Sequence, residues 1–323
     1  LPVDPINENY LENTLEWDYG ICKRRMRIIE GRFRDRWFFA VNPNGTIRIK
    51  HNFVGSLQPR LGYARDAEGN FLAVSVVGDE EIVLAEEFAK AVYPVEVGAS
   101  YTFYPDANPE TSTVDGVVNE NTATATWATI RNAAGDNATD AAALDEYVRF
   151  RTTADNKYGD LYRSIVLFDT SSLSDTDPII SATLAVCGGG KNDQGSWAPN
   201  ICVYSSAPAS NTALAAGDYD SLGTTDFSDY ITYAAWTLGV YNTFTLNASG
   251  IAAISKTGVT KLGCRNQNYD VANVAPTMYT DRYTMLYGYF AEQGEGYKPK
   301  LVVEYIDPIS INPAVQQAMA IIL

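Results

Sequence analysis

Short runs of apolar residues, each followed by turn-forming residues, recur along the chain. Residues 165–168 (IVLF) are apolar and rich in β-branched side chains, which favours a buried strand over a helix. The Asp, Ser, Thr and Pro residues of 169–178 predict a turn, because their side chains bond the backbone locally. Apolar residues alternate with smaller or polar ones over 180–186, which predicts a second strand with one buried face.

The same pattern predicts many other strands and almost no helix, apart from a short helical pattern at 80–90. The further predicted strands are 38–41, 46–50, 71–77, 147–151, 201–204, 241–246, 259–264, 285–290 and 301–305. Strand after strand predicts an all-β fold, with an antiparallel jelly-roll-like β-sandwich in the C-terminal part and a smaller antiparallel β domain before it.

The distribution of polar and turn-forming residues divides the chain into five parts. The predicted parts are an extended N-terminal arm (1–20), a small β domain (21–97), a linker (98–125), the β-sandwich (126–306) and an apolar C-terminal tail (307–323). The arm and tail are of the kind that exchange between subunits in symmetric oligomers. The chain begins at Leu1 rather than Met, so either a leader has been removed or the numbering is that of a processed product.

The balance of charge and hydropathy restricts the function. The 323 residues carry 39 acidic and 24 basic side chains and a net charge of −15, which argues against binding nucleic acid. No apolar run approaches the length of a membrane span. An acidic chain could hold a structural Ca²⁺, but acidic turns are more often simply solvated, so a metal site stays unassigned.

Basic residues are concentrated in one early segment. On a strand, Arg32, Arg34 and Arg36 would line one face, with aromatic residues on the other. This interaction patch could contact an acidic partner or polyanion, or an acidic surface of a second copy. The alternative is a solvated strand face that balances an acidic protein.

The four cysteines do not form a metal-binding or redox motif, since none is in a CxxC pair. Cys187 and Cys202 flank a Gly-rich segment and could form a disulfide across a hairpin, which would imply an oxidising compartment. Buried free thiols that act as small apolar residues are an equal alternative.

Catalytic motifs are scarce, and we expect the chain not to be an enzyme. Its one histidine, His51, is not accompanied by a nucleophile-elbow motif, and there is no phosphate-binding loop or dinucleotide fingerprint. Paired carboxylates such as Asp145 and Glu146 could serve a glycosidase, but an acidic chain offers many such pairs.

Aromatic residues in predicted loops and strand edges are better candidates for a binding site. Trp197, in the Gly-rich segment, with Tyr279 and Tyr283 could present aromatic faces to a sugar. Aromatic residues at strand spacing, such as Tyr287 and Tyr289, favour a core or interface role instead.

Several motifs resemble a known family of β modules. They are 163–173 (RSIVLFDTSSL), 180–184 (ISATL), 242–250 (NTFTLNASG) and 298–305 (KPKLVVEY). With them, residues 112–305 resemble the DNRLRE-type β-sandwich modules, which are related to carbohydrate-binding modules. The variant here is similar to modules in structural proteins of tailed bacteriophages, and such modules are found in adhesive, cell-wall and virion proteins.

The resemblance favours a structural or adhesive component of an extracellular assembly, above all a bacteriophage virion protein. Its expected partners are copies of itself, neighbouring virion or surface proteins and host glycans. Its expected location is a virion or the cell surface. The alternative is a secreted carbohydrate-binding module, and a polysaccharide hydrolase is least favoured.

Overall fold

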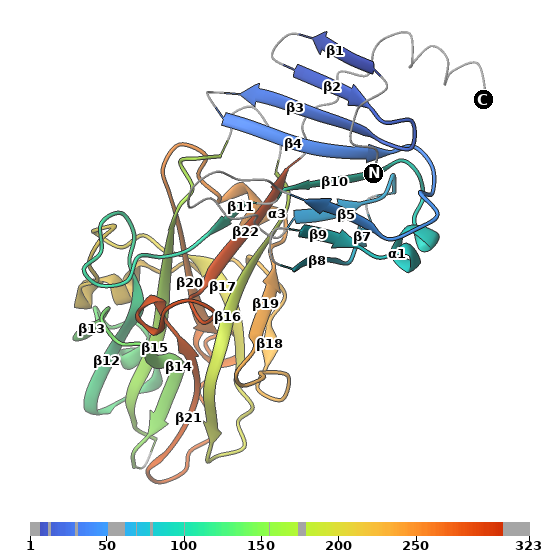
Figure 1. Ribbon diagram of the computed structural model, residues 1–323. Coiled ribbons are helices and arrows are strands. Elements are labelled where there is room, and N and C mark those ends of the chain that lie inside the picture. Colours follow the sequence, from blue (N-terminus) through green and yellow to red (C-terminus); the bar gives the residue numbers. More distant parts are fainter. Residues whose placement is uncertain are drawn as a thin grey trace. The chain divides into compact units, whose positions relative to one another are not determined.

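We describe the chain from a computed structural model, in two compact units, residues 1–101 and 102–323. The structure describes residues 7–11, 14–29, 32–50, 62–68, 70–77, 80–99, 101–154, 156–173 and 179–305. Strands dominate both units, and every strand pairing with a described register is antiparallel. The predicted all-β fold, an antiparallel β-sandwich preceded by a smaller antiparallel β domain, is confirmed (Figure 1).

The described residues of the first unit form two antiparallel sheets. The seven-stranded sheet has the order β1 (Asn7–Leu11), β2 (Thr14–Asp18), β3 (Lys23–Ile29), β4 (Arg32–Phe39), β10 (Val95–Ala99), β6 (Gly62–Arg65) and β7 (Phe71–Leu72). The smaller sheet has the order β5 (Ile47–Lys50), β9 (Glu80–Val83) and β8 (Val74–Val77). A short helix, α1 (Ala85–Lys90), buries Phe88 against Phe39, with ring centroids 5.2 Å apart.

The first unit differs from the sequence prediction at its N-terminal end. Part of the predicted arm forms the hairpin β1–β2, which continues the seven-stranded sheet, while residues 1–6 lie outside the described residues. Residues 38–41 and 46–50 do flank a turn, as predicted, but β4 and β5 then enter different sheets. The helical pattern at 80–90 resolves into strand β9 followed by helix α1.

The second unit is built around one long, curled path of strands with side branches. Its order is β11 (Tyr101–Phe103), β22 (Lys300–Tyr305), β16 (Ile179–Asp193), β21 (Arg282–Tyr289), β14 (Leu144–Thr152), β15 (Tyr158–Asp169), β20 (Val259–Asn266), β17 (Asn200–Ser205) and β18 (Ile231–Thr232). The branches are β12 (Asp115–Ala125), β13 (Asn137–Thr139) and β19 (Tyr241–Thr245).

Strand β16 connects the two layers of the sandwich (Figure 1). Residues 179–187 pair with β22 and β19, whereas residues 188–193 pair with β21. The register shifts between Gly188 and Gly190, where glycine permits close backbone approach. A Cβ added at Gly188 would lie 2.1 Å from the carbonyl oxygen of Thr237. Part of the Gly-rich segment, which was predicted as a loop, therefore forms the second half of β16.

Short helices cover the strands of the second unit. They are α2 (Trp127–Arg131), α3 (Ala248–Ala252), the 3-10 turns η1 (Ala216–Ser221) and η3 (Ala291–Gln293), and the π turn η2 (Gln267–Val271). The hydroxyl of Thr126 accepts a hydrogen bond from the N–H of Thr129 and begins α2. This places Trp127 in a core with Phe150 and Tyr158, its ring 6.0 and 5.0 Å from theirs.

The predicted linker at 98–125 is much too long. Its last eleven residues are β12, which pairs with β15 from Asp115 opposite Val166 to Ala125 opposite Tyr158. Seven successive residues, 113–119 (TVDGVVN), are buried, and they include the polar Thr113, Asp115 and Asn119. These three polar side chains, which suggested a linker, are instead enclosed in the second unit.

Candidate functional site

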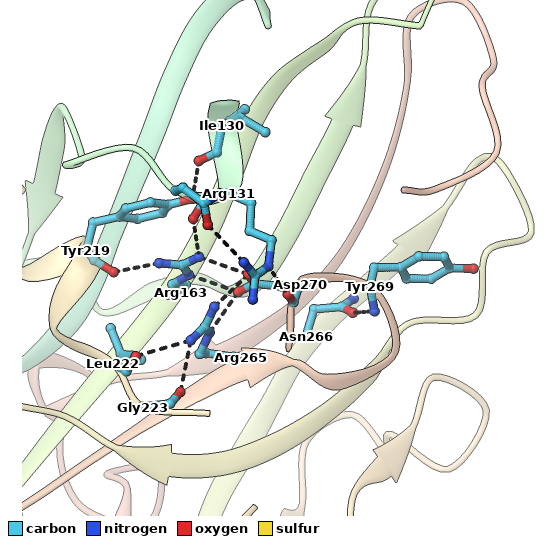
Figure 2. A network of polar contacts seen from close by, with 11 residues as sticks. Ile130, Arg131, Arg163, Tyr219, Leu222, Gly223, Arg265, Asn266, Tyr269 and Asp270 are labelled. Atoms are coloured by element: carbon cyan, nitrogen blue, oxygen red, sulfur yellow. Dashed lines mark hydrogen bonds and ion pairs between the residues drawn. The ribbon is translucent and has the colours of Figure 1, made fainter. Parts of the chain in front are cut away.

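The second unit contains a buried carboxylate that is held by arginines (Figure 2). Asp270, in η2, accepts bonds from Arg163 Nε and Nη2, each 2.8 Å long, and from Arg265 Nε and Nη2, at 2.9 and 2.7 Å. Arg131 Nε lies 3.7 Å from Asp270 Oδ1. Burial alone would raise the pKa of Asp270, but Arg163 and Arg265 outweigh it and lower the pKa to about 2.

The buried groups of this arginine network bond one another and the backbone. Arg163 Nη1 donates to the carbonyl of Tyr219 and stacks on its ring, and Arg265 Nη1 donates to the carbonyls of Leu222 and Gly223. Asp270, Arg163 and Arg265 are each at most 4% exposed. The network therefore has a structural role, since it ties the turns 216–223 and 267–271 to strands β15 and β20.

The same turn supports the loop that carries Trp197. The hydroxyl of Tyr269 donates to the carbonyl of Trp197 at 2.8 Å, and the side-chain oxygen of Asn268 accepts from the N–H of Asn200 at 2.9 Å. Asp193 accepts the N–H groups of Trp197 and Ala198 at the start of the loop. The loop is thus fixed by hydrogen bonds from both sides.

Trp197 does not present its ring face to solvent, contrary to its proposed role in sugar binding. It is 5% exposed, packs edge-on against Phe150 and Tyr279, and donates from Nε1 to the carbonyl of Thr277 at 2.9 Å. Its surroundings make it a core residue. Tyr279, which is 46% exposed, lies beside Trp197, whereas Tyr283 belongs to a different group.

Tyr283 is part of a charged and aromatic group on β14, β15 and β21. We call this group the Arg149 cluster; its members are Asp145, Glu146, Arg149, Arg151, Asp160, Tyr162, Tyr283 and Tyr287. The register places Arg149 opposite Tyr162, Arg151 opposite Tyr283 and Glu146 opposite Tyr287, so these side chains share one face.

The Arg149 guanidinium is the centre of the cluster. It bonds Asp160 through Nε and Nη2 at 3.1 and 3.2 Å, and Glu146 through Nη1 at 2.8 Å. It also lies over the rings of Tyr162 and Tyr283, 5.2 and 5.4 Å from their centroids. Burial lowers the pKa of Arg149, but the negative charges of Asp160 and Glu146 outweigh burial and raise it.

Two neighbouring carboxyl groups of the cluster, Asp145 and Glu146, have pKa values that are shifted in opposite directions. Burial, followed by a hydrogen bond with the Glu146 side chain, raises the pKa of Asp145 to about 7. Burial would also raise the pKa of Glu146, but its bonds with Asp145 and Arg149 lower it. The pair is therefore in direct contact, whereas glycosidase carboxyls are roughly 5–10 Å apart. Asp145 and Glu146 lack the geometry of a glycosidase pair.

The chemistry that the Arg149 cluster offers is recognition. Its carboxylates accept hydrogen bonds, its guanidinium groups donate them, and its half-buried tyrosines offer apolar ring surface. Arg149 and Arg151 are 21% and 28% exposed, so both reach solvent. Sequence reasoning found Tyr283 but missed the two arginines, although the alternation at 147–151 already placed them on one strand face.

The predicted basic patch in the first unit is occupied by internal partners where it can be described. Arg36 is 5% exposed and forms an ion pair with Glu96, so it is not a surface residue. Arg32 and Arg34 lie on β4, but their side chains are outside the described residues. On β3, Arg25 pairs with Glu16 at 2.8 Å and Arg24 lies over Trp37.

The four cysteines are free, buried thiols, so the predicted disulfide between Cys187 and Cys202 is not formed. Strand β16 continues through Cys187 into a different sheet pairing, and Cys202 donates to the carbonyl of Ser228 at 3.2 Å. Burial raises the pKa of the Cys22 thiol to about 11 and that of Cys264 to about 12.

The other candidate sites stay unassigned. Among the residues that the structure describes, no group of three histidine, cysteine or acidic side chains is arranged to hold a metal ion. His51 lies outside those residues. Within the same part of the chain, no helix has the length and apolar character to cross a membrane.

Comparison with known proteins gives no family. No family model and no curated protein matches the chain. Two solved structures of BuGH86 in complex with neoagarooctaose, one wild type and one variant, are each 9% identical with a TM-score of 0.23. They cover 90% of this chain, which spans 34% of theirs, and at this TM-score the likeness supports no inference.

Proposed function

We propose that the chain is a non-enzymatic structural and adhesive component of an extracellular assembly. A bacteriophage virion protein, such as a decoration, fibre or tail protein, is the favoured case. The observation that supports this proposal most is a surface patch of apolar side chains on the second unit. Its members, which we call the Leu144 patch, are Leu144, Val240, Tyr289 and Tyr297.

The Leu144 patch surrounds the glycines at which β16 changes sheets. The N–H of Gly188 donates to the carbonyl of Val240, and a Cβ at Gly189 would lie 2.1 Å from Leu144 Cδ1 and 3.5 Å from Tyr289 Cε2. The rings of Tyr289 and Tyr297 are 5.0 Å apart. Leu144 is 42% exposed and Val240 50%, and such apolar groups on one surface mark sites of protein contact.

The test of this proposal is the state of the chain in its native source and in solution. We expect electron microscopy of the source to show repeated copies on a capsid, tail or filament. We expect the purified chain to self-associate in light scattering, and Val240→Ser with Tyr297→Ser to weaken the association. Val274→Ser is the matched control, because Val274 is 51% exposed and lies outside the patch. A monomer at high concentration that is free in its source would contradict the proposal.

A second candidate function is glycan binding through the Arg149 cluster. Tyr162, Tyr283 and Tyr287 are half-buried and flank hydrogen-bonding groups, which is the combination that sugars require. The two guanidinium groups of the cluster pair with the carboxylates of Glu146 and Asp160, and Asp145 adds a third carboxyl group. Because the whole chain is also strongly acidic, a neutral glycan is favoured over a polyanionic one. Binding of host sugars is compatible with a virion role.

Glycan binding is tested on an array of neutral and anionic polysaccharides. We expect binding to neutral sugars that Tyr283→Ala reduces about 5- to 30-fold, the loss of one stacking contact of ~1–2 kcal/mol. Tyr279→Ala is the control, because that ring lies against Trp197 outside the cluster. No binding to any glycan would exclude this candidate. Polysaccharide hydrolysis is least favoured, and release of reducing ends from a bound glycan would support it.

A further inference from the structure

Three carboxyl groups of the second unit each contain a buried oxygen that lacks a hydrogen-bond partner. The oxygens are Oε1 of Glu110, Oδ1 of Asp115 and Oε2 of Glu292. They come from three segments: the loop 104–114, the first residue of β12, and turn η3. Asp115 is the most enclosed of the three, at 1% exposed. A buried, unpartnered carboxylate oxygen is costly, so the cluster needs a compensating group.

The second oxygen of each carboxyl has a partner, which lies in another segment for Asp115 and Glu292 and within the same loop for Glu110. Asp115 Oδ2 accepts the N–H of Ala291 at 3.1 Å, and Glu292 Oε1 accepts the N–H of Asn108 at 3.0 Å. Glu110 Oε2 accepts from the side-chain amide of Asn108 at 3.2 Å. Glu292 therefore attaches the loop 104–114 to η3, Asp115 attaches the start of β12 to η3, and Glu110 supports the loop from within.

The loop itself has a separate anchor. Asp106 Oδ2 accepts the N–H groups of Thr111 and Ser112 at 3.1 and 2.7 Å, together with both their hydroxyls. Burial would raise the pKa of Asp106, but these bonds lower it to about 2. This anchor of the loop is thus insensitive to pH near neutrality, whereas the bond of the loop to η3 and the bond from Asn108 to Glu110 depend on the carboxyl cluster.

Among the described residues, neither Lys nor Arg forms an ion pair with any of the three carboxyls. The titratable groups that act on Asp115 or Glu292 from other elements are Asp140 and, on β14, Tyr147. Burial, then Glu292 and Glu110, raises the pKa of Asp115 well above its usual range, and burial, then Glu110 and Asp140, raises that of Glu292.

We infer that Glu110, Asp115 and Glu292 form a proton-dependent clasp between the loop 104–114 and η3. When the clasp is closed, the three carboxyl groups hold protons, and this removes the cost of burying negatively charged oxygens that lack a partner. As the pH rises, the carboxyls ionise, repel one another in a poorly solvated site and release the loop from η3. The folded-state pKa values are raised, so the clasp is most stable in acid and weakens as the pH rises.

Hydrogen exchange of the whole chain at two pH values tests the clasp. After correction for intrinsic rates, we expect the amides of 108–115 and 291–293 to exchange at least about tenfold faster near pH 8 than near pH 5. Asp115→Asn removes the largest ionisable contribution and is expected to abolish this difference. Glu292→Gln serves as an independent second variant if Asp115→Asn fails to fold. Asp229→Asn, a charge-matched change at an exposed residue, is expected to keep it.

Two outcomes would overturn the clasp. One is equal pH dependence of local exchange in the wild type, Asp115→Asn and Glu292→Gln. The other is restored protection near pH 8 on addition of millimolar CaCl₂ to the wild type but not to Asp115→Asn, because the cluster would then take up a cation instead of protons. Local exchange is the readout because Asp145 also titrates in this unit and would change the global stability.

Discussion

Arg163 and Asp270 are 107 residues apart in the sequence and joined by two hydrogen bonds of 2.8 Å. Each oxygen of Asp270 also accepts a bond from Arg265, so one carboxylate compensates two buried guanidinium groups on neighbouring strands. Removing that carboxylate would leave both cations buried without a counter-charge, which costs far more than the bonds themselves contribute.

We therefore expect Asp270→Ala to be one of the most destabilising single changes in the second unit. The expected loss is about 3–5 kcal/mol of unfolding free energy, measured by urea denaturation. Asp229→Ala, at an exposed position, is the control. A loss below about 1 kcal/mol for Asp270→Ala would mean that water or other groups already solvate the two arginines.

A glycine in a left-handed backbone conformation lies in the turn between α2 and β13. Gly135 has φ +86°, and a Cβ there would lie 2.1 Å from the carbonyl oxygen of Ala216. We expect Gly135→Ala to lower the unfolding free energy by about 1–3 kcal/mol, because it adds both backbone strain and a clash. Gly217→Ala is the matched control, since nothing lies within 4 Å of a Cβ there. Equal thermal stability of the two variants would contradict the described turn.

The strands were predictable because their signal is local. The run at 165–168 and the alternation at 180–186 lie within β15 and β16, as expected. Their partners were not predictable, because β15 pairs with β12, β14 and β20, and β16 pairs with β19, β21 and β22. A periodicity of two specifies which face of a strand is buried but not which strand lies beside it.

The candidate site was predictable only in part for the same reason. Trp197 follows a Gly-rich segment, so the sequence favoured an exposed loop, but Phe150 and Tyr279 enclose its ring. Arg149 was predicted only as part of the strand at 147–151, and the pairing of β14 with β15 and β21 brings Asp160 and Tyr283 to it. Buried polar networks arise from long-range contacts that local composition cannot reveal.

The cysteines provide a direct chemical test of the structure. All four are buried thiols, and burial raises the pKa of Cys22 and Cys264, so little thiolate is available at neutral pH. We expect mass spectrometry to find four unpaired cysteines, and a thiol reagent to label the folded chain slowly but the unfolded chain at every cysteine. We also expect the thermal stability of the chain to stay unchanged when a reductant is added. A disulfide in the chain purified under non-reducing conditions would refute the assignment.

The contact between Asp145 and Glu146 makes the Arg149 cluster sensitive to pH near neutrality. The pKa of Asp145 is raised from 3.8 to about 7, first by burial and then by its bond with Glu146. Because the folded-state value is the higher one, the stabilisation from Asp145 is complete in acid and is lost as the pH rises through about 7. Deprotonation then places two carboxylates in contact, with Arg149 as the nearest cation.

Carbon-13 NMR of the side-chain carboxyls measures this directly. We expect Asp145 to titrate near neutrality in the wild type and at lower pH in Glu146→Gln, where burial still raises its pKa but the carboxylate partner is gone. Tyr283→Phe is the control, because it keeps the ring beside Arg149 and leaves the carboxyl pair intact. If Asp145 instead titrates at the same low pH in both the wild type and Glu146→Gln, the two carboxyls do not share a proton. In that case, any pH dependence of glycan binding by the cluster would have to come from another group.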